Sequence, residues 1–145
     1  MYNSEFMELA ISWAKKGKLV EGGGSFGCVI VRENEIIAQC HNEVSGSQDC
    51  TQHAELKCIQ MACKALNSKT LEDCVLYTSC VPCMMCLGAM KWAKFKHIYY
   101  GASAQDAKEA GFLYSDMYYS YDATKRDKDF NMTQKMQAEA VAVWT

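Results

Sequence analysis

The chain has 145 residues, of which 50% are hydrophobic and 22% are charged, with a formal net charge of −2. This composition is typical of a soluble globular protein, and a chain of this length buries enough surface to fold without disulfide staples. We therefore expect a single domain over residues 1–145. The slight acidic excess and the lack of a long Lys or Arg run count against a nucleic-acid partner.

The cysteines and the N-terminal segment bear on the cellular compartment. Nine cysteines are an odd number and too few for a disulfide scaffold. No run approaches the ~18 apolar residues that a membrane span needs, and MYNSEFMELAISWAKKGK alternates apolar and charged residues, unlike a secretory leader. The sequence predicts no membrane association and a reducing compartment, by default the cytoplasm, where cysteines are packing residues or metal ligands.

The first third of the chain predicts a helix and a hairpin. Apolar residues recur with helical spacing over residues 6–14, and Gly17 is expected to end that helix. The glycine-rich stretch EGGGSFG, residues 21–27, predicts either a flexible turn or a close approach of backbone to a ligand. Apolar runs at 28–31 and 36–40 then predict the two strands of a hairpin.

Helices and strands alternate in the rest of the chain. We expect a helix over 53–66, a strand over 74–78, a helix over 83–94, a strand over 97–102 and a short helix over 106–110. An irregular aromatic stretch to Phe130 is expected next, before a last helix with one apolar face made of Met132, Met136, Ala140, Val143 and Trp144. This alternation predicts an α/β fold with helices on both faces of one mixed sheet.

Two short motifs carry metal-binding side chains. His53 opens one expected helix, and Cys83 and Cys86 form a Cys-x-x-C at the start of another, directly after Pro82, the chain's single proline. The two helix starts can meet on one side of a sheet, where the positive end of the helix dipole favours thiolates. One His and two Cys suit Zn²⁺ and leave its fourth position open for water, as in catalytic zinc sites.

Glu55 follows His53 by two residues, close to the metal but in a diverging direction. A carboxylate in that place is a candidate general acid/base, which takes a proton from zinc-activated water and returns it to a substrate. His-x-Glu and Cys-x-x-C are each weak signals. In this order, each at an expected helix start, they are the signature of zinc deaminases that act on nucleobases.

Three other interpretations of the cysteines remain open. Cys80 lies three residues before Cys83 and could complete a four-ligand structural zinc site. Cys83 and Cys86 could be a redox pair, although the thioredoxin type places its Cys-x-x-C near an N-terminal βαβ unit. Ordinary buried thiols beside a core histidine would carry no chemistry at all.

Several longer segments extend the match beyond the zinc motif: GGSFGCVIV, HNEV, HAELKCI, LEDCVLYTSCVPCMMCLGAMKWAK and DAKEAGF. With these the chain, from Ser4 to Trp144, resembles the cytidine deaminase-like superfamily, and within it the small guanine deaminases of the bacterial type. The resemblance implies a three-layer α/β/α fold with one mixed central sheet of about five strands. It also implies a Zn²⁺ cofactor and hydrolytic deamination of a free nucleobase, first of all guanine to xanthine with release of ammonia.

The resemblance assigns roles to individual positions. His53, Cys83 and Cys86 would bind zinc, and Glu55 would move protons. The residues expected to contact the base are Asn42 through a hydrogen bond, Phe26 through its ring, Ala54 through its backbone, and Trp92 as a pocket wall. The alternatives are that Asn42 satisfies its own loop and that the two aromatic residues belong to ordinary packing.

One departure from the family pattern concerns the substrate. Guanine deaminases of this type carry an acidic residue just after EAGF that reads the purine, and Tyr114 stands in its place here. Asp116 is the nearest carboxylate, displaced by two residues, and it is the candidate substitute. A changed substrate edge is the alternative, because losing a carboxylate that faces ring N–H donors costs selectivity.

The competing functions follow from this departure. They are deamination of another aminated ring (cytosine, isocytosine, an aminotriazine, another purine or a nucleoside), deamination of adenosine in tRNA, and a catalytically idle zinc-binding module. The resemblance also implies a homodimer whose C-terminal segments, about residues 112–145, are swapped between subunits.

Overall fold

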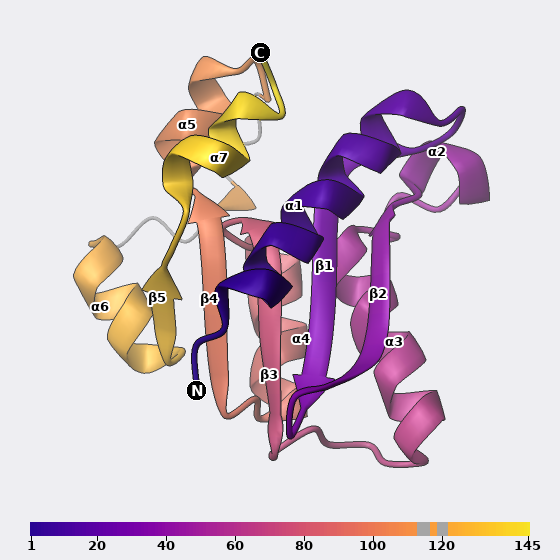
Figure 1. Ribbon diagram of the computed structural model, residues 1–145, viewed down its shortest axis with the longest axis vertical. Coiled ribbons are helices and arrows are strands. Elements are labelled where there is room, and N and C mark those ends of the chain that lie inside the picture. The colour runs from indigo at the N-terminus through magenta and orange to yellow at the C-terminus, as the bar shows by residue number, and fades with distance from the viewer. Residues whose placement is uncertain (113–116, 119–121) are drawn as a thin grey trace.

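The computed structural model describes residues 1–112, 117–118 and 122–145 (Figure 1). The elements in chain order are α1 (Ser4–Leu19), β1 (Gly24–Arg32), β2 (Glu35–Asn42), α2 (Val44–Ser47), α3 (Ala54–Leu66), β3 (Cys74–Cys80), α4 (Met84–Ala93), β4 (His97–Ala102), α5 (Ala104–Glu109), α6 (Ala123–Asp129), β5 (Met132–Gln134) and α7 (Gln137–Ala142).

The five strands form one mixed sheet in the order β2-β1-β3-β4-β5. β1 runs antiparallel to both β2 and β3, whereas β3, β4 and β5 are parallel. The β1–β2 hairpin closes at Glu33 and Asn34, which both have positive φ, as a two-residue turn matching the strand twist requires. The predicted hairpin, alternation and mixed sheet of about five strands are confirmed.

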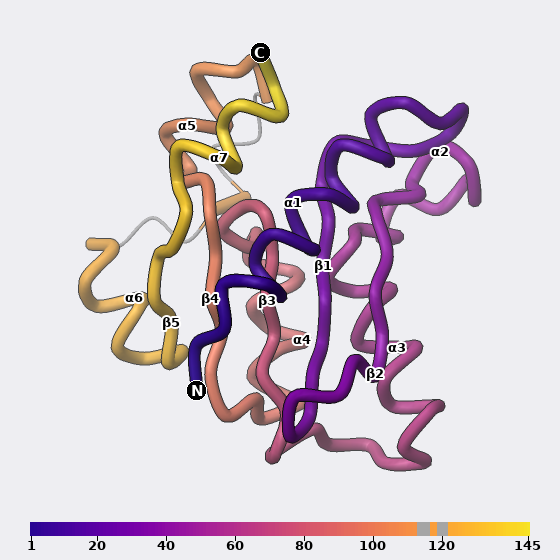
Figure 2. Tube along the Cα trace, viewed as in Figure 1, coloured from indigo at the N-terminus to yellow at the C-terminus, as the bar shows by residue number. Residues whose placement is uncertain are grey.

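Helices cover both faces of this sheet. α1 and α7 lie on the near face in Figure 1, and α3 and α4 lie behind it. The tube in Figure 2 shows α1 crossing in front of β1, against which α1 makes most of its contacts. α3 packs on β2 and β1 from the other side. The predicted three-layer α/β/α arrangement is therefore confirmed.

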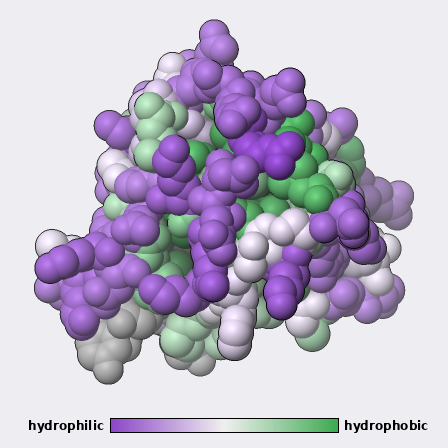
Figure 3. Space-filling model, turned by 90° about the horizontal axis from the view of Figure 1, so that it is seen from below, coloured by the Kyte–Doolittle hydropathy of each residue, from purple (hydrophilic) through white to green (hydrophobic). Residues whose placement is uncertain are grey.

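The core lies between these layers. All seven residues of β3 are buried, as expected for the central strand of a sheet that is covered on both faces. α1 contributes a buried stripe with helical spacing: Met7, Ala10, Ile11, Ala14 and Gly17. The end of the molecule that carries the hairpin turn, seen from below in Figure 3, is covered mainly by hydrophilic side chains, with smaller apolar areas between them.

Three expectations about elements are wrong. The last helix does not begin near Met132, because Met132–Gln134 form β5 and pair with β4, and α7 starts only at Gln137. The stretch before Phe130 is not wholly irregular: α6 begins after Asp122, whose side chain accepts bonds from Thr124 and Lys125 N–H. α1 continues past Gly17 to Leu19.

Candidate metal centre

The three expected zinc ligands meet at one end of the sheet. His53 is the N-cap residue of α3, Cys83 is the N-cap residue of α4, and Cys86 lies in the first turn of α4. His53 Nδ1 lies 3.6 Å from Cys83 Sγ and 3.7 Å from Cys86 Sγ. Among the His, Cys, Asp and Glu residues in the described part of the chain, these three side chains lie close enough together to hold a metal ion.

These distances fit tetrahedral zinc. With Zn–S near 2.3 Å and Zn–N near 2.0 Å, the edges of a tetrahedron are roughly 3.6–3.8 Å long. The side chains are thus spaced as the ligands of one Zn²⁺, and they supply three ligands, which leaves the fourth position open. Cys80 is not part of this group, so the described residues give no closed four-ligand site.

The ligands interact strongly with one another. The hydrogen bond from the Cys86 thiol lowers the pKa of Cys83 to about 4, with a further contribution from His53. The same Cys83–Cys86 bond raises the pKa of Cys86, and the hydrogen bond with Cys83 raises the pKa of His53. One thiolate is therefore stabilised in the metal-free group, and metal binding displaces the remaining protons.

Glu55 sits in the first turn of α3, beside the ligands, with 6% of its surface exposed. Burial raises the pKa of its carboxyl to about 7, because the charged form loses hydration, and the nearby Cys83 adds to the effect. The carboxyl nevertheless lines a cavity together with His53 and Cys83. Such a group can exchange protons with a molecule bound there.

The cavity beside the metal ligands has a volume of about 750 Å³, within the usual range of small-molecule sites. Its walls are Lys18, Gly23, Gly24, Ser25, Phe26, Asn42, Val44, Ser45, Cys50, His53, Glu55, Cys80, Val81, Cys83, Met85, Phe112, Met117 and Tyr118. The glycine-rich stretch is thus part of the wall, as one of its two interpretations proposed.

Two of the expected base contacts, Asn42 and Phe26, line this cavity. Asn42 Oδ1 accepts a hydrogen bond from Val44 N–H at 3.1 Å. This bond orients the amide, so that its NH₂ group is the side that can donate to a ligand. The hydrogen bond of Asn42 within its own loop, which was the alternative to base binding, is therefore compatible with a contact to the base.

The other expected contacts lie differently. Ala54 is fully buried, its carbonyl accepts the Cys40 thiol at 3.2 Å, and it is not among the described residues that line the cavity, so its backbone contact with the base stays a prediction. Trp92 is 83% exposed on α4 and is not among the described residues that line the cavity of this chain, so its place as a pocket wall stays a prediction. Asp116 and Tyr114 fall outside the described residues.

Several cavity residues were not expected from the sequence, among them Lys18, Cys50 and Tyr118. Lys18 belongs to the last turn of α1, where a lysine is the ordinary complement of the helix dipole. Nothing in its sequence context distinguishes it from a surface lysine. Only the packing of α1 beside the glycine-rich stretch brings it to the cavity.

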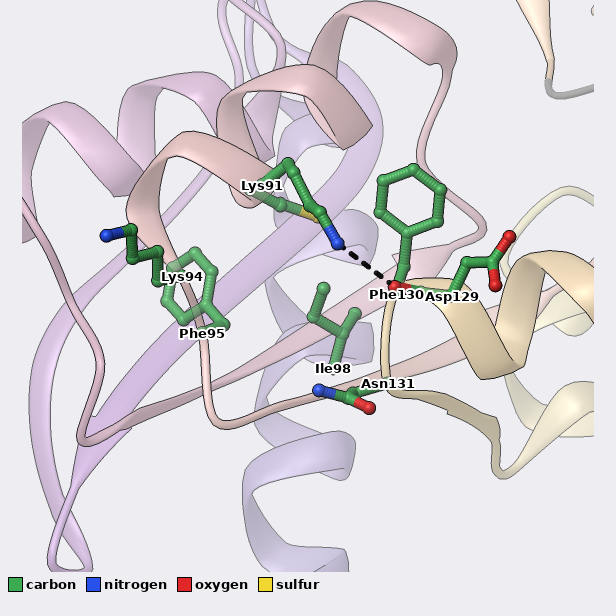
Figure 4. Close-up of a pocket in the computed structure, with 8 residues that line it drawn as sticks. Lys91, Lys94, Phe95, Ile98, Asp129, Phe130 and Asn131 are labelled. Carbon is green, nitrogen blue, oxygen red and sulfur yellow. Dashed lines mark hydrogen bonds between the residues drawn. The ribbon is translucent and has the colours of Figure 1, made fainter.

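A second hollow of about 250 Å³ lies between the ends of α4 and α6 (Figure 4). Lys91 Nζ points across it, donates to the Asp129 carbonyl and lies 5.5 Å from the centre of the Phe130 ring. These contacts join the two helices. The hollow contains none of the metal ligands and none of the expected base contacts.

Two further findings concern the chain as a whole. None of the nine cysteines, all of which lie in described residues, is in a disulfide. Among the helices of the described residues, none has the length and apolar character needed to span a membrane.

Residues 1–102 match the family model of the cytidine and deoxycytidylate deaminase zinc-binding region. These residues contain all three metal ligands and Glu55. The chain belongs to this family. The matched region is the zinc-binding region of the family, and the group of His53, Cys83 and Cys86 fits this metal. Zn²⁺ is therefore the cofactor.

Members of the family with known activities resemble the chain over most of its length. Guanine deaminase of Bacillus subtilis (strain 168) is 44% identical over 128 residues, which cover 88% of this chain and 82% of the relative. Its crystal structure superposes with a TM-score of 0.76, at 40% identity, covering 90% of this chain and 92% of that one.

Two more proteins resemble the chain at lower sequence identity. A tRNA-specific adenosine deaminase of Aquifex aeolicus (strain VF5) is 39% identical over 108 residues, which cover 74% of this chain and 70% of the relative. The structure of a guanine deaminase from Nitrosomonas europaea has a TM-score of 0.84 at 21% identity, covering 99% of this chain and 82% of that one, which shows the shared fold.

Proposed function

We propose that the protein is a zinc-dependent hydrolase that deaminates a free nucleobase, with guanine converted to xanthine and ammonia. The observation that carries this proposal is the open His53, Cys83 and Cys86 group with the Glu55 carboxyl beside it, in a cavity of small-molecule size. The identity of 44% to a guanine deaminase supports the substrate.

The roles of the site residues follow from the geometry. Bound zinc supplies a Lewis acid that activates water as a nucleophile near neutral pH. Glu55 would take a proton from the attacking water and would deliver one to the ring or to the departing amino group, so that guanine and water give xanthine and ammonia. Its burial keeps bulk water from competing for the transfer.

The cavity wall offers contacts for a planar aminated ring. The Asn42 amide can donate to a ring carbonyl or ring nitrogen, and Phe26 offers an aromatic surface for the base. The backbone contact of Ala54 with the base is likewise proposed from the resemblance alone, because Ala54 is not among the described residues that line the cavity. Asp116 is proposed to read the purine, because Tyr114 stands where guanine deaminases of this type carry an acidic residue. This role remains a prediction from the sequence.

Two observations favour guanine, rather than adenosine in tRNA, as the proposed substrate. The match to the guanine deaminase extends over 128 residues, compared with 108 for the tRNA-specific enzyme, a difference of 20. The chain is also slightly acidic, with a net charge of −2, whereas tRNA binding calls for a basic surface. We further propose a cytoplasmic homodimer, on the basis of the resemblance to small guanine deaminases and of the unpaired cysteines.

Ammonia release by the zinc-loaded protein tests the proposal. The panel contains guanine, cytosine, isocytosine, adenine, their nucleosides, aminotriazines and a tRNA substrate. Glu55→Gln is the blank, with Glu109→Gln on exposed α5 as the matched control. Guanine turnover that is lost only with Glu55→Gln, at unchanged zinc content, is the expected result. Turnover of another ring or of tRNA would reassign the substrate. No ammonia release from any compound of the panel would indicate a catalytically idle zinc-binding module.

A further inference from the structure

The C-terminal residues lie against the wall of the cavity. α7 leads from the outer part of the sheet towards the end of α1, and the C-terminus lies at the same end of the molecule as the carboxyl end of β4 (Figure 2). Lys18 Nζ donates to the Val143 carbonyl at 2.7 Å, and Val143 itself is buried. This contact joins the end of α1 to the end of the chain.

Trp144 contacts three residues of the cavity wall. Its Nε1–H donates to the Ser25 carbonyl at 3.0 Å. Its ring centre lies 5.6 Å from that of Phe26 and 5.0 Å from that of Phe112, and the rings of Phe26 and Phe112 are themselves 5.0 Å apart. The three rings form a compact cluster with the tilted geometry that aromatic pairs prefer.

All the partners of Trp144 in this cluster line the cavity, whereas Trp144 is not among the described residues that do. Ser25 and Phe26 belong to the glycine-rich stretch and directly follow its three consecutive glycines, residues 22–24, whose backbone has more freedom to lose on ordering than that of other residues. The hydrogen bond from Trp144 to the Ser25 carbonyl and the contact of its ring with Phe26 restrict the motion of this segment.

We propose that Trp144 is a positioning residue for the substrate, holding the Ser25–Phe26 segment and the Phe26 ring in the arrangement that receives the base. The inference rests on the proposed function, because it assigns Phe26 to the binding of a planar ring. Without Trp144, binding has to order the glycine-rich segment, and that cost reduces affinity rather than the rate of the chemical step.

The kinetics of three variants on guanine test this role. Trp144→Ala should raise KM about tenfold with kcat nearly unchanged. Trp144→Phe keeps an aromatic ring against Phe26 and loses only the bond to Ser25, so KM should return most of the way to the wild-type value. Ile36→Ala, which removes an exposed apolar side chain from β2 beside the hairpin turn, should leave both constants unchanged.

Other kinetic outcomes would overturn the proposal. A Trp144→Ala enzyme with unchanged KM does not need the indole for binding. A lower kcat at unchanged KM would mean that a smaller fraction of the protein is folded, which is a structural role only. Equal KM values for the Ala and Phe variants would exclude the ring contacts as the cause.

A second measurement is independent of the substrate. Hydrogen exchange in the peptide of residues 20–27 should become about tenfold faster in Trp144→Ala, while exchange in β3 stays as in the wild type. Unchanged exchange at 20–27 would refute the positioning role even if guanine is the substrate. If the wild type does not turn over guanine but the exchange result holds, the proposed substrate fails and the positioning role stands, to be measured on the ring that is turned over.

Discussion

Cys83 and Cys80 lie three residues apart, and the structure separates them clearly: Cys83 belongs to the metal group and Cys80 does not. Zinc at about 100 times its Kd should stabilise the wild type by about 2.7 kcal/mol, which raises Tm by roughly 5–10 °C for a domain of this size. We expect Cys83→Ser to lose most of this zinc-dependent shift, because one of three ligands is gone. Cys80→Ser should keep it.

The comparison of each variant with and without zinc removes any effect of the substitution on the metal-free fold. Differential scanning calorimetry after chelation and after zinc addition gives the two Tm values. Loss of the shift in both variants would show that Cys80 is a ligand as well, and that the site is the closed, structural type.

Asn42 offers a second test at the scale of one side chain. Asn42→Asp keeps an oxygen that can accept from Val44 N–H, so Tm should change little. The variant lacks the NH₂ donor and places a negative charge near the base, so KM for guanine should rise about 10- to 100-fold. Asn34→Asp, in the distant hairpin turn, is the control. An unchanged KM would mean that Asn42 only satisfies its own loop.

At this scale the sequence predicted residues whose chemistry is unusual and missed residues whose chemistry is ordinary. His53, Cys83 and Cys86 were predicted as a group because few functions need those residue types at two helix starts. Lys18 and Trp144 were not predicted near a cavity, since their positions depend on how the two ends of the chain pack together. Trp92 was expected at the cavity wall but is not among the described residues that line it in this chain, because the sequence does not reveal which face of a helix an aromatic residue occupies.

Among the elements, α1 and β1 are in unusually close contact at Gly27. A Cβ atom at Gly27 would lie 2.1 Å from the Ala10 carbonyl oxygen and 2.6 Å from Ala14 N, both backbone atoms of α1. Gly27→Ala should therefore force α1 away from the sheet and destabilise the protein by about 1–3 kcal/mol. Gly88→Ala on α4, where a Cβ meets nothing within 4 Å, should instead stabilise it by about 0.5–1 kcal/mol.

Urea unfolding of both variants measures these free energies. The pair separates the effect of packing from that of backbone entropy, since both substitutions restrict the unfolded chain equally. Equal stability changes for Gly27→Ala and Gly88→Ala would show that α1 can shift without cost.

Elements that have their own local signals were predicted well, and those that depend on a distant partner were not. α3 has a clear apolar face, α4 starts directly after Pro82 and Cys83, and the ends of both helices agree with prediction within a residue or two. β5 has only three residues and exists because β4 offers a free edge to pair with. Helical spacing of Met132 and Met136 therefore predicted the wrong element. For α6 the sequence did contain a signal, an Asp at the N-cap, that was overlooked.

For the molecule as a whole, the cavity depends on the middle of the chain and on its C-terminal residues. The zinc ligands and Glu55 come from residues 53–86, whereas Val143 and Trp144 hold the wall from the other side. β5, α7 and Trp144 follow the residues about 112–121 that join them to the rest. If the protein is the proposed homodimer with swapped C-terminal segments, Trp144 of each subunit would support the cavity of the other.

Mixed dimers test the swap. Two differently tagged chains, one with Glu55→Gln and one with Trp144→Ala, are expressed together and the mixed species is isolated by both tags. In a swapped dimer, one cavity has Glu55 together with the Trp144 of the other chain, and the second cavity lacks both. The mixed dimer should then show the wild-type KM at half the wild-type kcat. Without a swap, the cavity that keeps Glu55 lies beside Ala at position 144, and KM should stay about tenfold high. A dimer of wild type with Glu55→Gln calibrates the halved kcat, and failure to recover any mixed species would show that the chains do not form the proposed homodimer.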